Sequence, residues 1–474
     1  MSTEQGKYGE IKDEVGSFRD SIGTINEDGD RKWVYPKKPK GPYYTKRTIT
    51  SYILLIILFG APFVKIDGEP LILFNIIERK FVIFGQIFWP QDFFLFVIAM
   101  LTTIVFIILF TAVFGRIFCG WICPQTIFME MVFRRIEYWI EGDWTHQKKL
   151  NKAPWTGSKI FKKTLKHFIF WLISFLIANT FLAYIVGVEE LWKIQTDPIG
   201  EHFWGFIAIF IFTTLFYLVF SFLREQVCTT ICPYGRLQGV LLDENSMVVA
   251  YDHKRGEGRA KFKKNEDRAE AKKGDCIDCS QCVHVCPTGI DIRNGTQLEC
   301  VNCTACIDAC DHMMDSVGMD KGLIRFVSEN GIKNGTRFQW TRRVKAYTAL
   351  LIGMVIVLVV LLVTRKDFET TILRQRGSTY QILDGSVSNI FEINLTNKTR
   401  NDYTIELRTE DPDAEIEMVV SNLMLEKEQE VTERFIMKIP LNTIKNGRKN
   451  VTVIIMGNGK ELQREEAQFI GPVL

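Results

Sequence analysis

The stretch that decides the fold is "CIDCSQCVHVCP", residues 276–287, together with "CVNCTACIDAC", residues 300–310. In each stretch, four cysteines are separated by two, two and three residues. The chain has 12 cysteines, and all of them lie between positions 119 and 310. Disulfide frameworks belong mainly to small secreted domains, so this clustering instead indicates metal ligation.

This spacing is that of a bacterial two-cluster ferredoxin, in which three thiolates of one run bind one iron–sulfur cluster and the fourth binds the other cluster. We therefore predict an inserted ferredoxin domain (α+β) over residues 241–345, with two [4Fe–4S] clusters as cofactors. The expected ligands of the first cluster are Cys276, Cys279, Cys282 and Cys310, and those of the second cluster are Cys300, Cys303, Cys306 and Cys286. Two zinc sites are the alternative, but they do not require two identical four-cysteine runs.

Apolar segments lie on both sides of the cysteine-rich region. Each of five segments is long enough to cross a bilayer, which takes about 20 residues; they are 48–65, 92–114, 167–188, 203–223 and 346–363. Buried helices of a soluble protein are the alternative, and the Lys and Arg residues that flank the segments argue against it. We predict a multi-domain integral membrane protein with an α-helical bundle of five transmembrane helices. Four of these helices belong to a membrane domain over 48–240, and the fifth covers 346–365.

Two further segments do not fit this pattern. Residues 71–90 are apolar but are interrupted by "ERK", and they are expected to lie at the outer membrane interface instead of spanning the membrane. Residues 254–273 are strongly basic and are expected to form a solvated linker that also suits anionic lipid headgroups. The formal net charge of the chain is only +3, which gives no indication of a nucleic acid partner.

The distribution of Lys and Arg predicts the orientation in the membrane. The segment 1–47 ends in "KKPKGPYYTKR" and the loop after the second span is also basic, whereas the loop after the third span carries only Lys193. Because basic loops stay on the cytoplasmic side, we expect a cytoplasmic N-terminus and a cytoplasmic ferredoxin domain. No signal peptide is visible, because about 45 mostly polar residues precede the first span. The expected location is the bacterial inner membrane, with the C-terminal domain in the periplasm.

Two pairs of cysteines form a repeat at the ends of apolar hairpins. "FCGWICPQ", residues 118–125, ends the first hairpin, and "VCTTICP", residues 227–233, ends the second. Each pair is a C-x3-C-P motif. A repeated unit in a membrane protein often builds one site between its two copies. We therefore expect four cysteines to converge on the cytoplasmic side, namely Cys119, Cys123, Cys228 and Cys232.

The proline of each motif is expected to begin a helix, which places the second cysteine at the helix N-terminus. There the helix dipole favours thiolate over thiol, and thiolates bind soft metals. The helix after Pro124 is expected to be amphipathic and to lie on the inner membrane surface. Three interpretations of the four cysteines remain open: a closed zinc site, a disulfide redox couple and a Cu(I) site. The reducing cytoplasm disfavours the disulfide, and the neighbouring redox clusters favour copper over zinc.

The C-terminal segment 366–474 alternates apolar and polar side chains between turn signals, as in "NIFEINLTNKT" and "KNVTVIIMG". The spacing of these segments predicts an all-β Ig-like sandwich. The segment contains no cysteine and no histidine. We therefore expect a binding or docking module.

Taken together, "FCGWICPQ", "VCTTICPYGR", the doubled cysteine runs, the fifth span and "ILRQRGSTYQILDGSVSNIFEINLTNKT" resemble the CcoG/FixG/RdxA family of cytochrome c oxidase accessory proteins. The resemblance covers nearly the whole chain. It implies a membrane-bound cupric reductase, which converts Cu(II) to Cu(I) with two [4Fe–4S] clusters and supports assembly of cbb3-type cytochrome c oxidase. The implied catalytic and copper-binding residues are Cys119, Cys123, Cys228 and Cys232.

The resemblance implies three partners: the lipid bilayer, a copper ion, and cbb3-type cytochrome c oxidase or its copper-delivery factors. The sequence does not identify the electron donor, and it leaves a homodimer open. Two alternatives belong to other functional classes. One is a membrane quinol dehydrogenase resembling NapH or NosR, in which copper is not a substrate. The other is a non-enzymatic assembly scaffold, in which the clusters are structural or sensory.

Overall fold

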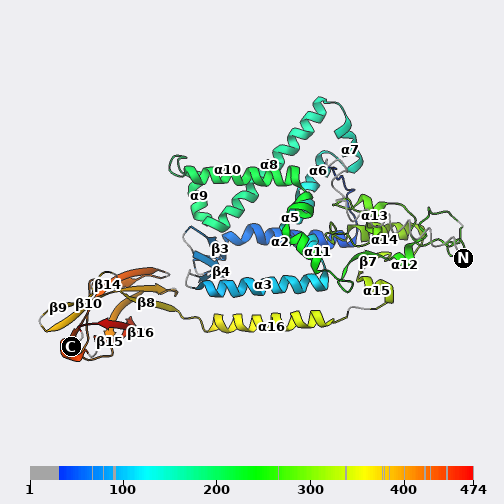
Figure 1. Ribbon diagram of the computed structural model, residues 1–474. Coiled ribbons are helices and arrows are strands. Elements are labelled where there is room, and N and C mark those ends of the chain that lie inside the picture. The colour runs from blue at the N-terminus through cyan, green and yellow to red at the C-terminus, as the bar shows by residue number, and fades with distance from the viewer. Residues whose placement is uncertain are drawn as a thin grey trace. The chain divides into compact units, whose positions relative to one another are not determined.

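The computed structural model describes residues 31–472 except 67, 78–79, 89–91, 265, 337–338, 376, 378, 384, 400, 421–422, 428 and 445–446 (Figure 1). The part of the predicted N-terminal segment that precedes Arg31 lies outside the described residues. The chain divides into two compact units. Unit 1 comprises Met1–Gly85 and Phe96–Ile356, and unit 2 comprises Gln86–Leu95 and Val357–Leu474.

Within the described residues, five helices are long and apolar enough to cross a membrane, as the sequence predicts. They are α2 (Pro42–Gly60) with the 3-10 turn η1 (Ala61–Phe63), α3 (Phe93–Phe114), α8 (Gly157–Val186), α10 (Phe203–Leu218) with the π-helical η4 (Val219–Leu223), and α16 (Arg342–Val363). Helix α8 begins well before the predicted position 167, because Thr156 caps it by accepting a hydrogen bond from the Lys159 backbone N–H. The short helices α7 (Trp144–Lys152) and α9 (Val188–Thr196) lie before and after α8.

The described part of the interrupted stretch 71–90 forms strands. The strands β3 (Ile72–Asn75) and β4 (Lys80–Ile83) pair as an antiparallel hairpin. The short strands β1 (Lys65–Ile66) and β2 (Glu69–Pro70) precede this hairpin, and β5 (Gln86–Phe88) follows it. The expectation that this stretch does not span a membrane is confirmed for these residues, and its place at the outer interface stays a prediction.

The segment after the first C-x3-C-P motif is helical and buried. The short helix α4 (Ile117–Trp121) carries the first cysteine, and α5 (Pro124–Ile127), the π-helical η3 (Phe128–Phe133) and α6 (Arg134–Ile140) follow the motif. Phe133 is fully buried, with its ring centroid 4.5 Å from that of Phe220 and 4.8 Å from that of Phe170. The sequence predicts a helix on the membrane surface, but here the charged Arg134 and Glu137 are buried as well. The difference arises because partners within unit 1 pair these charges.

The two cysteine runs lie in a small α+β region of unit 1, as predicted. The strand β6 (Val248–Tyr251) pairs antiparallel with β7 (Ile324–Val327). Between them lie α12 (His253–Gly256), α13 (Gln281–His284), the 3-10 turn η6 (Ile292–Asn294) and α14 (Ala305–Val317), and α15 (Glu329–Asn334) follows β7. The core of this region contains Val249, Ile307, Met314 and Leu323 beside cysteines of both runs.

The basic segment 254–273 is folded against the α+β region. Nη2 of Arg268 donates hydrogen bonds to the carbonyl oxygens of Ala260 (3.2 Å), Gly274 (2.5 Å) and Cys276 (3.1 Å). Arg255 forms an ion pair with Asp275. These contacts anchor the backbone that leads into the first cysteine run. Most of the lysines of the segment are nevertheless exposed, so the segment is solvated as predicted, and its affinity for lipid headgroups stays a prediction.

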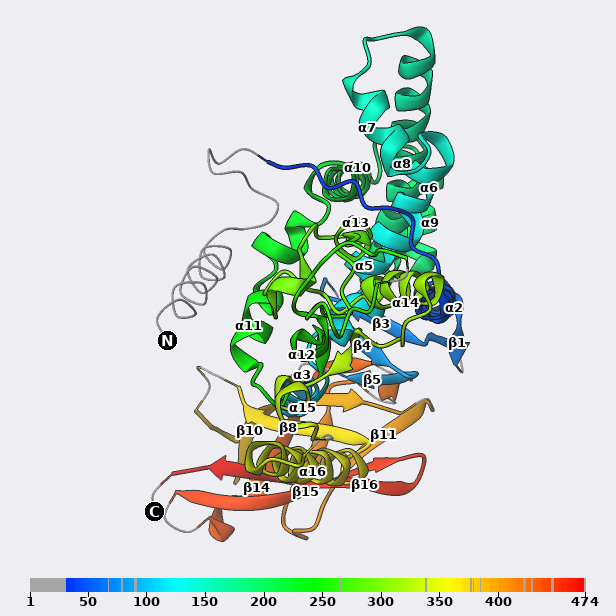
Figure 2. The ribbon, with the colours of Figure 1, turned by 90° about the vertical axis from the view of Figure 1, so that its right-hand side faces the viewer.

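Helix α14 also holds the start of α2. The carboxylate of Asp308 accepts hydrogen bonds from the backbone N–H groups of Tyr43 (3.1 Å) and Tyr44 (2.7 Å). No side chain at the N-cap of α2 provides such a bond, so the acceptor that the first helical turn requires comes from α14. Figure 2 shows α14 beside the start of α2, and the two helices are in contact. The cysteine-rich region is thereby joined to the first candidate membrane helix.

Unit 2 contains the predicted all-β sandwich. One sheet has the strand order β12-β14-β10-β8, with β9 also paired to β10, and the other has the order β13-β11-β15-β16. The strands are β8 (Phe368–Arg374), β9 (Gln381–Leu383), β10 (Ser386–Asn397), β11 (Tyr403–Thr409), β12 (Glu415–Met418), β13 (Leu423–Leu425), β14 (Glu430–Pro440), β15 (Arg448–Gly457) and β16 (Lys460–Ile470). Phe391 and Phe435 stack with their ring centroids 5.4 Å apart in the shared core.

Candidate redox site

Eight cysteines line two cavities in the α+β region. The first cluster cavity is lined by Cys276, Cys279, Cys282 and Cys310. The second cluster cavity is lined by Cys286, Cys300, Cys303 and Cys306, and Cys282 reaches it as well. Each cavity gathers the four cysteines that the sequence predicts as ligands of one cluster. Four thiols around a cavity with apolar walls are the donor set that a [4Fe–4S] cluster requires.

The two cysteine runs have the same backbone conformation. The residues on either side of the second cysteine have positive φ in both runs, with Asp278 at 51° and Ser280 at 54° in the first and Asn302 at 52° and Thr304 at 64° in the second. This conformation is uncommon for residues other than glycine, and it persists where the surroundings impose it. Turns with left-handed residues can direct successive backbone N–H groups toward an anion, as at many Fe–S sites. The loops therefore suit the negative sulfurs of a cluster.

The two C-x3-C-P motifs also share one local structure. Cys123 is the N-cap of α5 and Cys232 is the N-cap of α11 (Pro233–Leu241), and a proline begins each helix. The backbone N–H of each cysteine bonds the carbonyl oxygen five residues earlier, that of Phe118 (2.9 Å) or Val227 (2.7 Å). The prediction that the second cysteine of each motif lies at a helix N-terminus is confirmed.

The two motifs face each other through exchanged contacts. The Cys119 thiol donates a hydrogen bond of 3.0 Å to Oε1 of Gln238, which lies on the helix after the second motif. The Cys228 sulfur lies 4.0 Å from Oγ1 of Thr126, which lies on the helix after the first motif. The four motif cysteines are close enough to interact electrostatically. The structure therefore brings together Cys119, Cys123, Cys228 and Cys232, and we call this group the thiol site.

The thiol site is more open than a tetrahedral metal site. Among the described residues, no three of its sulfurs lie within 4.8 Å of one another, whereas Zn–S bonds of about 2.3 Å place tetrahedral sulfurs about 3.8 Å apart. Either zinc or copper, if bound by all four cysteines, would therefore draw the sulfurs closer together than they lie in this structure. Burial raises the pKa of Cys119 to about 11 and that of Cys228 to about 12, so both side chains are thiols at neutral pH.

The thiol site packs directly against the second cluster cavity. Cys119 belongs to one buried cluster of side chains with Val301, Cys303 and Ala305. Gly120 lies against the same segment, since a Cβ at this position would be 2.4 Å from the Val301 carbonyl oxygen. Only glycine allows so close an approach of two backbones. The first motif is therefore docked on the second cysteine run.

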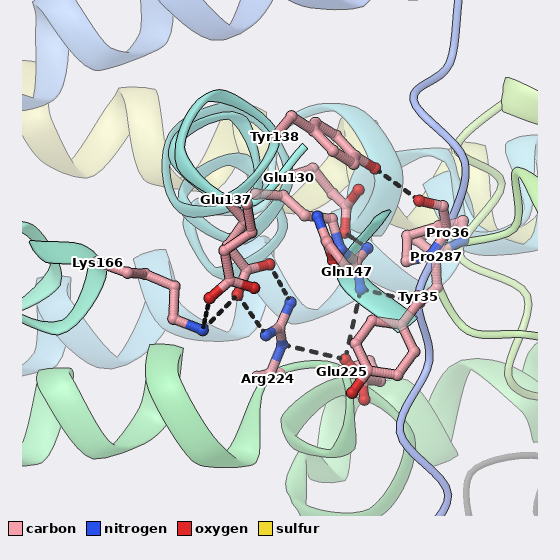
Figure 3. Close-up of polar contacts among 12 residues, drawn as sticks. Tyr35, Pro36, Glu130, Glu137, Tyr138, Gln147, Lys166, Arg224, Glu225 and Pro287 are labelled. Atoms are coloured by element: carbon pink, nitrogen blue, oxygen red, sulfur yellow. Dashed lines mark hydrogen bonds and ion pairs between the residues drawn. The ribbon is translucent and has the colours of Figure 1, made fainter. Parts of the chain in front are cut away.

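Buried ion pairs hold the turn before the second motif (Figure 3). Arg224 donates two hydrogen bonds of 2.7 Å to the Glu137 carboxylate, and Lys166 lies 3.7 Å from the same carboxylate. Burial alone would raise the pKa of Glu137, but these cations outweigh it and hold the pKa at about 2. Arg224 has φ 53° and ψ −123°, an unusual conformation for a residue other than glycine. The network thus holds a strained turn that leads into Cys228.

The same network reaches the second cysteine run. Arg134 lies 3.5 Å from the Glu225 carboxylate and donates a hydrogen bond of 3.4 Å to the carbonyl oxygen of Pro287, the residue after Cys286. Arg31 also pairs with Glu225, at 3.0 Å. A set of fixed charges therefore connects the turn before the second motif to a loop that lines the second cluster cavity.

Sequence analysis does not identify Arg47, Arg116 or Gln238 as site residues. All three are buried, and Nε of Arg116 donates a hydrogen bond of 3.1 Å to Oε1 of Gln238. In the sequence, both arginines are basic residues near the ends of apolar segments, where such residues indicate only orientation. Arg116 could have been found from its place three residues before Cys119, because Arg224 holds a similar place before the second motif.

Comparison with protein families indicates an iron–sulfur protein. The family model described as a 4Fe-4S dicluster domain matches residues 223–329, and a model described as a 4Fe-4S binding domain matches residues 96–150. A model described as an "IG-like fold at C-terminal of FixG" matches residues 358–472. With the five candidate membrane helices, these domains define a membrane-bound iron–sulfur protein of the electron-transfer class.

Related proteins match most of the chain. Protein RdxA of Cereibacter sphaeroides is 32% identical over 79% of this chain and 81% of its own length, and protein RdxB of the same species is 33% identical over 80% and 83%. The nitrogen fixation protein FixG of Rhizobium meliloti is 34% identical over 63% of this chain and 57% of its own length. The chain belongs to the FixG/RdxA family, as the resemblance of its motifs predicts.

Replacing Gly120 by alanine should push the first motif away from the second cysteine run, because the new Cβ would meet the Val301 carbonyl oxygen. We expect the variant to keep its iron, since position 120 lines neither cavity. On the copper hypothesis drawn from the sequence, the rate at which Cu(II) reoxidises the reduced protein should fall roughly tenfold or more, because misplacement by about 1 Å can slow a reaction strongly. Anaerobic stopped-flow absorbance measures this rate. Gly353→Ala, whose Cβ meets nothing within 4 Å, is the control, and equal rates in the two variants would contradict the prediction.

Replacing Glu137 by glutamine should destabilise unit 1, because the buried Arg224 would lose the carboxylate that accepts two of its hydrogen bonds and would keep only the longer contact with Glu225. Removing one partner of a buried ion pair typically costs about 3–5 kcal/mol. The midpoint temperature of unfolding in detergent should therefore fall. The double variant with Glu137→Gln and Arg224→Gln should recover part of the loss, since it also removes a stranded charge. A single variant as stable as the wild type would show that the network does not stabilise the protein.

Proposed function

We propose that this chain is a membrane-bound cupric reductase, which reduces Cu(II) to Cu(I) at the thiol site with electrons from two [4Fe–4S] clusters. Copper is the substrate, and its proposed ligands are Cys119, Cys123, Cys228 and Cys232. The proposed ligands of the first cluster are Cys276, Cys279, Cys282 and Cys310, and those of the second cluster are Cys286, Cys300, Cys303 and Cys306. The two cysteine-lined cavities support this division.

The observation that carries the proposal is the packing of Cys119 against the second cluster cavity. Cys119 and Cys303 belong to one buried cluster of side chains, and Cys282 lines both cavities. The first cavity, the second cavity and the thiol site therefore form a row in which each member contacts the next. Iron–sulfur clusters, when bound, transfer single electrons, and the reduction of Cu(II) to Cu(I) takes one electron.

The side chains of the thiol site favour the reduced product. Sulfur is a soft ligand that prefers Cu(I), so binding at this site makes Cu(II) easier to reduce. Burial keeps Cys119 and Cys228 protonated at neutral pH by raising their pKa values, so copper binding by these thiols releases protons. Gln238 orients the Cys119 thiol through its hydrogen bond.

We also propose a place for the protein in the cell. The distribution of Lys and Arg supports insertion in the bacterial inner membrane with the N-terminus and the cysteine-rich region in the cytoplasm and the sandwich in the periplasm. The resemblance of the motifs to the CcoG/FixG/RdxA family of cytochrome c oxidase accessory proteins supports a role in assembling cbb3-type cytochrome c oxidase, to which the Cu(I) would be delivered directly or through copper-delivery factors.

One experiment separates the cupric reductase from the quinol dehydrogenase and the scaffold. The full-length protein is reduced anaerobically with dithionite, freed of excess reductant, and mixed with Cu(II) while cluster absorbance and Cu(I) are followed. A cupric reductase forms one Cu(I) for each electron that leaves the clusters. Clusters that stay reduced in Cu(II) but are reoxidised by a quinone indicate the dehydrogenase, and clusters that stay reduced with both oxidants indicate the scaffold.

Replacing Cys119 and Cys123 by serine should impair copper binding and reduction about as much as replacing Cys228 and Cys232. The reason is that the contacts of the thiol site are exchanged between the two motifs, so neither pair is complete alone. Combining all four changes should add little, as expected for residues that act as a unit. Iron content should persist in every variant, and Thr230→Ala, a change in the same turn that removes no sulfur, is the control. Normal activity without either pair would contradict the proposal.

The proposed topology predicts opposite results for two reporter fusions. A reporter that is active only in the periplasm should be active when fused after Leu474, which lies outside the described residues, because the described residues contain five proposed spans between the cytoplasmic N-terminal segment and the sandwich. The same reporter fused near Gly322 should be silent, because the cysteine-rich region is proposed to be cytoplasmic. The reversed pattern would show that the orientation is wrong.

A further inference from the structure

Two buried arginines lie where the thiol site meets the second cluster cavity. Arg47 on α2 is 2% exposed, and Arg116, directly before α4, is 3% exposed. Nε of Arg47 donates a hydrogen bond of 2.7 Å to the Gly120 carbonyl oxygen, and Nε of Arg116 bonds Gln238. Each guanidinium keeps one buried nitrogen without a partner among the described residues, namely Arg47 Nη2 and Arg116 Nη1. Two cationic side chains therefore have unused donors at this junction.

Both arginines lie near cysteines of the second cluster cavity. The Gly120 carbonyl oxygen, which accepts the hydrogen bond of Arg47, belongs to a residue that packs on the backbone of Val301, between Cys300 and Cys303. Arg47 interacts electrostatically with Cys303, and Arg116 interacts with Cys300 and with Cys119. The second cavity and the thiol site thus share a positive environment.

The carboxylate that also faces this cavity does not cancel the positive charge. Glu130 interacts with Cys303, but it is already paired with Arg134. The ion pairs of the described residues join Arg134 to Glu130 and Glu225 and include neither Arg47 nor Arg116. The two buried guanidinium groups are therefore uncompensated by any carboxylate that the structure describes.

The first cluster cavity has a different environment. Arg293 lines it, but this arginine is paired with Asp278 at 2.6 Å and with Asp291 at 2.7 Å. The carboxylate of Asp311 follows Cys310 directly and interacts with it electrostatically. Among the described residues that line this cavity, Arg293 is the one cation, and its charge is neutralised, whereas a further carboxylate lies close by. Arg268 bonds the Cys276 carbonyl oxygen but does not line the cavity.

This asymmetry has a direct effect on redox chemistry. Reduction adds one negative charge to a cluster, and a fixed positive charge nearby stabilises the reduced form. Net charge and hydrogen bonds to the sulfurs are among the factors that set the potential of an iron–sulfur cluster. A buried cation is costly unless an anion compensates it, and a cluster with its thiolates is such an anion. A cluster bound in the second cavity would therefore compensate part of the charge of the two arginines.

We propose that Arg47 and Arg116 give the second cluster a higher reduction potential than the first, and thereby direct electrons from the first cluster through the second to the thiol site. In the internal step the first cluster loses one electron and the second gains it, without exchange of protons or bonds. The last transfer, from the second cluster to Cu(II), rests on the proposed function. The difference in reduction potential between the two clusters is independent of that function.

The test is an anaerobic redox titration of the full-length protein in detergent, without copper, followed by electron paramagnetic resonance. The wild type should show two separate one-electron steps. Arg47→Gln and Arg116→Gln should each lower the reduction potential of the higher-potential step and leave the other step unchanged. The expected decrease is roughly 59 mV, which for one electron is a tenfold change in the equilibrium constant. Lysine at position 47 or 116 keeps the positive charge, so these variants should retain most of the difference between the two reduction potentials.

Two further variants complete the test. Arg343, at the start of α16, is a cation that bonds the Leu241 carbonyl oxygen. Its replacement by glutamine should change the reduction potential of neither step. Gln238→Glu introduces a carboxylate at the group that Arg116 Nε bonds, and it should lower the higher step without removing either arginine. If a glutamine variant loses its iron, the Gln238→Glu and lysine variants decide the question.

Several results would overturn the proposal. They are two coincident steps in the wild type, equal shifts of both steps in the glutamine variants, equal effects of lysine and glutamine, or no shift in Gln238→Glu. Because copper is absent from the titration, the result is independent of the substrate. A potential difference that persists in a protein unable to reduce Cu(II) would contradict the proposed function alone.

Discussion

The backbone of Gly120 rests on the backbone of Val301, and the arrangement of the cysteine sites depends on this contact. Any side chain at position 120 would collide with the Val301 carbonyl oxygen. The contact brings Cys119 into the same buried cluster as Cys303. The carbonyl oxygen of Gly120 in turn accepts the hydrogen bond of Arg47. One residue without a side chain thus allows a thiol, a cluster cavity and a buried cation to meet.

The internal repeat explains why the thiol site is shared. Each copy ends in the same turn, with its second cysteine at the start of a helix. The first cysteine of each copy then contacts the helix of the other copy, through Gln238 in one case and Thr126 in the other. The copies differ in what surrounds them, since the first is docked on the second cysteine run and the second is held by the ion pairs of Arg224. A duplicated hairpin has therefore produced one asymmetric site.

Much of this organisation could be predicted from the sequence because its signals are local. Cysteine spacing, hydropathy and alternation each act within a few tens of residues, and they predict the grouping of the cysteines in the two cavities, the five apolar helices and the sandwich. The buried charges could not be predicted in this way. Glu137 looks like a residue on the solvated face of an amphipathic helix, and its partner Arg224 lies 87 positions away. Arg47 likewise meets Gly120 across 73 positions.

The carboxylate of Asp308 has a consequence for biogenesis. It supplies the acceptor for the first turn of α2, yet it is synthesised about 265 residues after Tyr43. Because chains fold from the N-terminus during synthesis, the start of α2 waits for α14, the helix that carries Cys306 and Cys310. Until α14 has folded, the first turn of α2 therefore lacks the acceptor that its backbone N–H groups have in the complete structure.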